Sequence, residues 1–121
     1  MLTPAPLRLP ELHPLAKQVL SAMQPTAHGL RIPETRWDDI VERLRSDGQG
    51  AAVCKDLTLK ALELEAKRCR NSSEQLLTLV IVALGAVEAS RVLAESGMSR
   101  MAVNSAVHRA QATHKPSHQK R

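Results

Sequence analysis

Apolar residues recur at helical spacing through most of the chain after residue 33. Thr35 can cap a helix whose apolar stripe follows at i, i+3, i+4 and i+7, namely Trp37, Ile40, Val41 and Leu44. The glycines of Asp47-Gly48-Gln49-Gly50 predict the end of this helix. A second amphipathic stripe predicts a helix from Lys55 to Arg70, and Asn71-Ser72-Ser73 predicts a break and a new helix cap.

The run from residue 74 to residue 85 is apolar on all sides, with three β-branched residues in a row at 80–82. Periodicity does not separate a buried helix from a buried strand in such a run. We expect a helix, because no partner strand is visible elsewhere and a lone strand cannot satisfy its backbone. The pattern as a whole predicts an all-α fold, a small helical bundle with a C-terminal helix-turn-helix.

Prolines and charges divide the 121-residue chain, which has the length of one domain. Six of the seven prolines lie in residues 1–33, which we expect to form a partly disordered arm interrupted by a short helix from Leu12 to Met23. Residues 34–112 are the predicted helical domain, and residues 113–121 a basic flexible tail.

The net charge of +5 comes entirely from the C-terminal end. Residues 1–96 hold 12 basic and 12 acidic residues, whereas residues 97–121 hold five basic residues and no acid. Such a concentration of positive charge favours a polyanionic partner. One Trp, with no Phe or Tyr, argues against modules that stack single-stranded bases on aromatic side chains.

The sequence lacks the features typical of several classes of protein. The longest apolar run, Leu76 to Val87, is about half of a membrane span, and the early prolines interrupt any leader, so we expect a cytoplasmic protein. Cys54 and Cys69 lack zinc or disulfide spacing and are interpreted as buried or idle thiols. No phosphate-binding loop, nucleophile elbow or metal-ligand spacing appears, so we expect no enzyme, cofactor or metal. His13 and His28, in the arm, are expected to be exposed.

Residues 88–112 have the pattern of two helices joined by a tight turn. The first helix would cover 88–95 and the second 100–112, with Ser96-Gly97-Met98-Ser99 between them. Gly97 suits a helix C-terminus, where the chain commonly enters the left-handed region. Ser99 stands where an N-cap belongs.

The second of these helices has two chemically different faces. Val103, Ala106, Val107 and Ala110 share a face that can pack inward. The opposite face carries Met101, Asn104, Ser105, His108 and Ala112, flanked by Arg100 and Arg109. This outer face has no carboxylate to repel phosphate, and Asn and Arg can bond adenine and guanine in a bidentate manner.

The run from Gly97 to Ala110, Gly-Met-Ser-Arg-Met-Ala-Val-Asn-Ser-Ala-Val-His-Arg-Ala, resembles the turn and recognition helix of the TrfB (KorA-type) plasmid repressors. Those proteins carry a similar Gly-x-Thr-Arg-x-Ala-Val-x-x-Ala-Val-His-Arg run, and the promoter-reading helix of sigma factors is more loosely similar. The resemblance implies a small helical dimer that represses transcription from palindromic operators. It assigns DNA-facing roles to Ser99, Arg100, Asn104, Ser105, His108 and Arg109. Leu93 and Ser96 depart from the family's pattern.

The sequence therefore predicts a sequence-specific double-stranded DNA-binding protein, a homodimeric repressor of plasmid, phage or bacterial genes. Backbone amides near Ser99, with Arg100 and Arg109, would hold phosphates. Asn104 and Ser105 would contact base edges, and Arg100 and His108 are further candidates for base contacts. Lys115 and the rest of the tail would add nonspecific affinity for DNA. The alternative is an all-helical protein interaction module, an adaptor or anti-activator that binds a partner helix through the stripes of residues 37–70.

Overall fold

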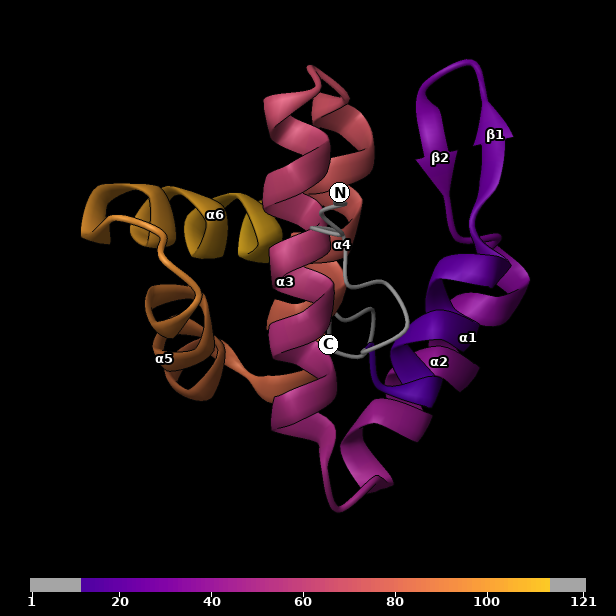
Figure 1. The fold of residues 1–121 in the computed structure, drawn as a ribbon, viewed down its shortest axis with the longest axis horizontal. Coiled ribbons are helices and arrows are strands. Elements are labelled where there is room, and N and C mark those ends of the chain that lie inside the picture. Colours follow the sequence, from indigo (N-terminus) through magenta and orange to yellow (C-terminus); the bar gives the residue numbers. More distant parts are fainter. Residues whose placement is uncertain (1–11, 114–121) are drawn as a thin grey trace, which may run out of the picture.

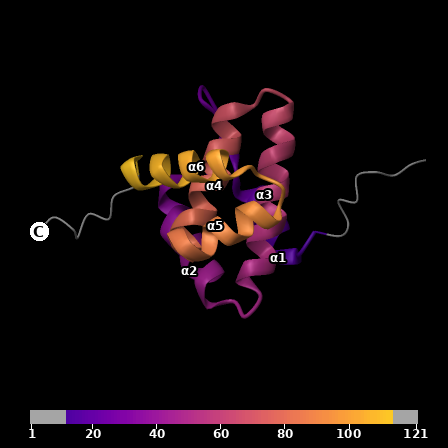
Figure 2. The same cartoon turned by 90° about the vertical axis from the view of Figure 1, so that its left-hand side faces the viewer.

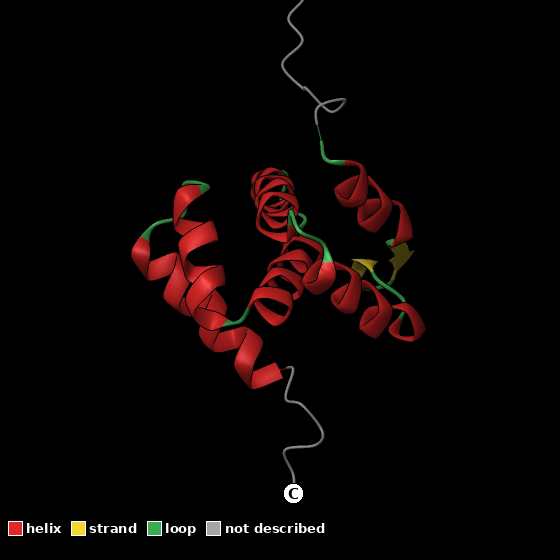
Figure 3. Ribbon diagram, turned by 90° about the horizontal axis from the view of Figure 1, so that it is seen from below, coloured by secondary structure: helices red, strands yellow, loops and turns green. Residues whose placement is uncertain are grey.

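The structure is a computed structural model, and it describes residues 12–113. Within that range the chain forms six helices and one two-stranded antiparallel sheet. In chain order these are α1 (Pro14–Ala22), β1 (Gln24–Thr26), β2 (Gly29–Arg31), α2 (Glu34–Ser46), α3 (Gly50–Ala66), α4 (Arg70–Leu84), α5 (Ala86–Glu95) and α6 (Arg100–Thr113). Figure 3 shows how little of this fold is strand. The predicted small helical bundle is confirmed in that the fold is mostly helical, but the expectation of an all-α fold misses the short sheet.

Helices α3 and α4 lie side by side at the centre of the molecule (Figure 1). On one side of this pair lie α5 and α6, and on the other lie α1, α2 and the β1–β2 hairpin. The predicted helix in the apolar run 74–85 is confirmed as part of α4. It is buried on several sides because elements pack against it from both flanks, and its buried apolar residues are Leu76, Leu77, Leu79, Val80, Ile81 and Ala83.

The connection between α2 and α3 lies where the glycines predict it, although the helix bounds differ. Helix α2 begins at Glu34, without a side-chain cap, so the expected cap at Thr35 is wrong. Helix α3 begins at Gly50 rather than Lys55. A Cβ atom at Gly50 would stand 2.4 Å from the carbonyl oxygen of Leu44, so only glycine allows the two helices to approach so closely here.

The break between α3 and α4 also differs from the prediction. Helix α3 ends at Ala66 rather than Arg70, and the chain turns through Arg68, whose φ is +68°. Ser72 and Ser73 do not cap a helix; both are buried inside α4. Ser72 instead makes a long-range contact, in which its hydroxyl accepts a hydrogen bond from the backbone N–H of Leu30, at 2.8 Å.

The expected boundary at residue 34 does not separate loose from packed chain. Ala16 and Val19 of α1 and Ile32 after β2 are buried in the common core. Helix α1 spans Pro14–Ala22, within the predicted range. His13, expected to be exposed, is half-buried and caps α1, because its Nδ1 accepts the N–H of Leu15 at 3.0 Å. Residues 1–11 of the expected arm and 114–121 of the expected tail lie outside the described residues.

The β1–β2 hairpin, which the sequence does not predict, is held by polar side chains of α4. The Gln75 side-chain oxygen accepts the backbone N–H of Ile32 at 2.6 Å, next to the bond between Ser72 and Leu30. Both side chains are buried, and each satisfies a donor that a strand edge leaves free.

Within residues 12–113, no helix has both the length and the apolar character that crossing a bilayer requires.

Candidate nucleic-acid interface

The turn between α5 and α6 has the geometry that its sequence predicts. Gly97 has a φ of +107°, in the left-handed region that glycine tolerates best. Its N–H donates to the carbonyl of Ala94 at 3.0 Å, and the N–H of Met98 donates to Leu93 at 3.2 Å. This pair of bonds is a Schellman motif, and half-buried Met98 adds the apolar contact that usually accompanies it. The turn therefore fixes the direction in which α6 leaves α5.

Ser99 caps the N-terminus of α6, as predicted. Its Oγ accepts a hydrogen bond from the N–H of Ala102 at 3.1 Å. The first turn of α6 contains no acidic residue, so the partial positive charge of the helix N-terminus is not offset by a side chain of that turn. Arg100, at the first helical position, is exposed and adds a full positive charge there.

Helix α6 is two-sided in the way that its spacing predicts. The side that faces α4 and α5 is buried at Val103, Ala106 and Ala110, and Val107 is half-buried against the same core. Figure 2 shows α6 on the outside of the molecule, next to α5 and across α4. Each of the predicted DNA-facing residues within the described range is exposed, and these are Ser99, Arg100, Met101, Asn104, Ser105, His108 and Arg109.

The seven residues thus lie on one helix and its cap, with Met101 77% exposed at the N-terminal end. Ala112 is exposed as well. The eighth predicted residue, Lys115, lies outside the described residues.

One carboxylate reaches this face from another element, which the sequence of the segment does not reveal. Glu74 of α4 forms an ion pair with Arg109, with 3.8 Å between the Glu74 Oε2 and Arg109 Nε atoms. The two side chains are 44% and 57% exposed, so solvent screens the pair. The expectation of an outer face free of carboxylates is therefore wrong at the C-terminal half of α6.

The acidic residues of α5 form ion pairs within their own helix. Glu88 and Glu95 both pair with Arg91, the latter with 3.5 Å between the charged atoms. Both pairs connect residues three or four positions apart on one helix, where side chains are neighbours. The three charges of α5 sum to −1, so Arg91 offsets one of the two carboxylates and one negative charge remains on this helix.

In comparisons with known proteins, no family model, curated protein or solved structure matches this chain. The resemblance of residues 97–110 to the TrfB-type repressors stays a prediction.

Proposed function

We propose that this chain binds duplex DNA sequence-specifically, with α6 as the recognition helix of a helix-turn-helix formed by α5, the turn and α6. The observation that carries the proposal is the two-sidedness of α6. Its apolar side is buried at Val103, Ala106 and Ala110, and its opposite side offers Asn104 and His108 to solvent. A helix exposed along one polar face can enter the major groove, which is about 12 Å wide.

The exposed groups suit the two tasks of such a helix. Asn104, near the middle of the helix, has an amide that can pair with an adenine edge. Arg100 and the capped N-terminus near Ser99 provide positive charge and amide donors for phosphate. Met101 and Ser105 complete the face with apolar and hydroxyl contacts.

The interaction-module alternative depends on the stripes of residues 37–70. Most of their apolar side chains are in this chain's own core, including Ile40, Leu44 and Leu57. Leu59 is 46% exposed, so some apolar surface remains in this region, but the buried part of the stripes is not available to a partner helix, and this favours the DNA-binding proposal.

The finer proposal, supported by the TrfB-type resemblance, is a homodimeric transcriptional repressor. A two-fold dimer would place two copies of α6 in successive major grooves, about 34 Å apart, so its operator would be a palindrome.

The test is selection of bound sites from a random duplex pool, followed by affinity measurements on the selected site and on random duplex. Asn104→Ala should reduce the preference for the selected site by about 1–3 kcal/mol. Arg100→Ala should weaken binding to both duplexes and make the slope of log K against log salt shallower by about 0.9. Arg36→Ala is the matched control, because Arg36 is exposed on α2, on the other side of α4.

Deletion of residues 114–121 should weaken binding to both duplexes about equally. A pool from which no site is enriched, or an Asn104→Ala variant with unchanged preference, would contradict the proposed recognition helix.

A further inference from the structure

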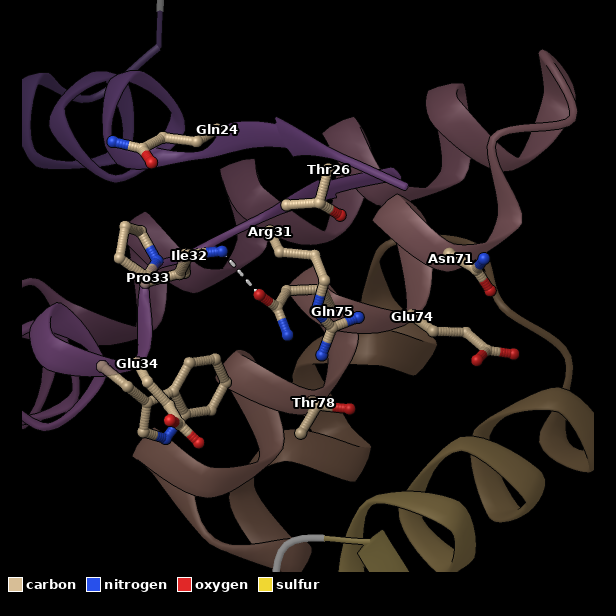
Figure 4. Close-up of a pocket in the computed structure, with 11 residues that line it drawn as sticks. Gln24, Thr26, Arg31, Ile32, Pro33, Glu34, Asn71, Glu74, Gln75 and Thr78 are labelled. Carbon is tan, nitrogen blue, oxygen red and sulfur yellow. Dashed lines mark hydrogen bonds between the residues drawn. The ribbon is translucent and has the colours of Figure 1, made fainter. Parts of the chain in front are cut away.

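A cleft of about 650 Å³ opens on the side of α4 away from α5, between the hairpin, the start of α2 and α4 (Figure 4). Its volume is in the range of small-molecule sites, roughly 300–1,000 Å³. Its lining includes Arg31 from β2, Trp37 from α2, and Glu74, Gln75 and Thr78 from α4.

Hydrogen-bond donors without a protein partner converge in this cleft. Gln75 is only 7% exposed, and its oxygen is used by Ile32, yet its Nε2 group has no acceptor among residues 12–113. The Arg31 guanidinium reaches across the cleft toward α4, and it forms no ion pair within the described residues. The half-buried Thr78 hydroxyl is a third donor with no acceptor among residues 12–113. A ligand group with several acceptor lone pairs would satisfy these donors together.

One wall of the cleft is apolar. Trp37 is half-buried there, beside Ile32 and Pro33. An indole offers a large flat surface on which a planar ligand body can pack. Trp37 is also the single aromatic residue of the whole sequence, apart from histidines, so any change in indole fluorescence of the folded chain comes from this one side chain in the cleft.

We propose that the cleft binds a small organic monocarboxylate with a flat apolar body. The carboxylate accepts hydrogen bonds from Arg31 and from the Gln75 amide, and the body lies against Trp37. Glu34 and Glu74 also line the cleft, so its charged side chains sum to −1; the ligand carboxylate therefore has to lie next to Arg31, the one basic residue of the described lining, and a second anionic group has no cation to pair with. The lining therefore selects monocarboxylates over dicarboxylates and phosphates.

The cleft borders the recognition helix through α4. Glu74 and Thr78 also line a second, smaller hollow of about 60 Å³ between α4 and α6, together with Ala106 and Arg109. Glu74 thus faces the cleft and pairs with Arg109 of α6. A carboxylate bound beside Glu74 repels it and weakens its hold on Arg109, so ligand binding alters the DNA affinity. This second step rests on the proposed DNA-binding function.

The ligand site is tested without DNA, by titrating the full chain with benzoate and phenylacetate while Trp37 fluorescence is recorded. The neutral amides, benzamide and phenylacetamide, are the shape-matched controls. We expect a saturable change with the carboxylates and about tenfold weaker binding of the amides, because charge-assisted bonds to Arg31 are lost.

Arg31→Gln should weaken carboxylate binding about tenfold, Arg31→Lys should restore part of it, and Arg36→Gln should have no effect. Far-UV circular dichroism checks that each variant is folded. The absence of a saturable change with both carboxylates, equal binding of the amides, or an unchanged affinity in Arg31→Gln overturns the proposed site.

The link to α6 is tested by measuring affinity for the selected duplex with and without a saturating carboxylate. We expect a change of about threefold or more, and its loss in Glu74→Gln. If the ligand binds but the DNA affinity is unchanged, the proposed link between the cleft and α6 is wrong, whereas the proposed carboxylate site is still supported. A chain that binds no duplex at all refutes the proposed function, whereas the Trp37 titration still decides the ligand site.

Discussion

Gly97 provides the sharpest test of how the turn orients α6. The residue has a φ of +107°, and a Cβ atom added to it would meet nothing within 4 Å. Replacement by alanine therefore introduces no steric clash, and its cost comes from backbone conformation alone. That cost is about 1–2 kcal/mol for a non-glycine residue held in the left-handed region.

Gly48→Ala is the matched control. A Cβ atom at Gly48 also meets nothing within 4 Å, but its φ is not in the left-handed region. Alanine there restricts the unfolded chain and is expected to raise the free energy of unfolding by about 0.4–1 kcal/mol. The restriction of the unfolded chain is common to both variants and cancels, so their free energies of unfolding should differ by about 1–2 kcal/mol, or roughly 4–16 °C in Tm.

Urea unfolding followed by Trp37 fluorescence and by far-UV circular dichroism measures this difference. Both variants have the same change in composition, so composition cannot explain a gap between them. If Gly97→Ala and Gly48→Ala unfold at the same urea concentration, the left-handed turn does not stabilise the fold as argued. At a temperature where both are folded, Gly97→Ala should also bind the selected duplex more weakly, because the turn directs α6.

Two further changes test other parts of the fold. Ser72→Ala removes the acceptor of the Leu30 N–H and should lower the free energy of unfolding by about 1–3 kcal/mol. Ser105→Ala, on the exposed face of α6, should leave the free energy of unfolding nearly unchanged. Equal urea midpoints for the two variants would refute the role of Ser72. Burial raises the pKa of the Cys54 thiol to about 12, so a thiol reagent at pH 8 should label exposed Cys69 and spare Cys54 until the chain unfolds. Because the unfolded thiol ionises near pH 9 and the folded thiol near pH 12, its contribution to stability is fully present below pH 9 and is lost as the pH rises between these values. Cys54→Ala should therefore flatten the dependence of the free energy of unfolding on pH in this range. Equal labelling rates of the two thiols, or an unchanged pH dependence in Cys54→Ala, would contradict the burial of Cys54.

The parts of the fold that the sequence predicts are those with local causes. The stripe of α2 and the apolar run of α4 lie in helices because periodicity and length are properties of a single segment. Gly97 and Ser99 are equally local, since a left-handed turn and a helix cap each depend on one residue type at one position. These signals were sufficient to predict which side of α6 faces solvent.

The hairpin has no such local cause. Its strands are three residues long, too short for an alternating pattern, and β1 contains Pro25. It is stabilised by Ser72 and Gln75, which lie more than 40 residues further along the chain. Prolines that suggested a loose arm instead begin elements, because Pro14 occupies the first turn of α1 and Pro33 precedes α2.

Glu74 shows what the sequence of α6 leaves out, and the omission bears on how α6 would meet DNA if the proposed function holds. Its carboxylate offsets Arg109 near the C-terminal end of the helix, whereas Arg100 and the capped N-terminus have no carboxylate of the same turn beside them. A phosphate is therefore attracted most strongly to the N-terminal end. Asn104 then lies about one turn into the helix from that anchor, where base edges are read when a helix enters the groove N-terminus first. If α6 binds DNA as proposed, its uneven charge therefore favours entry into the groove by the N-terminal end. The residue types on the exposed face of α6 do not by themselves indicate which end enters.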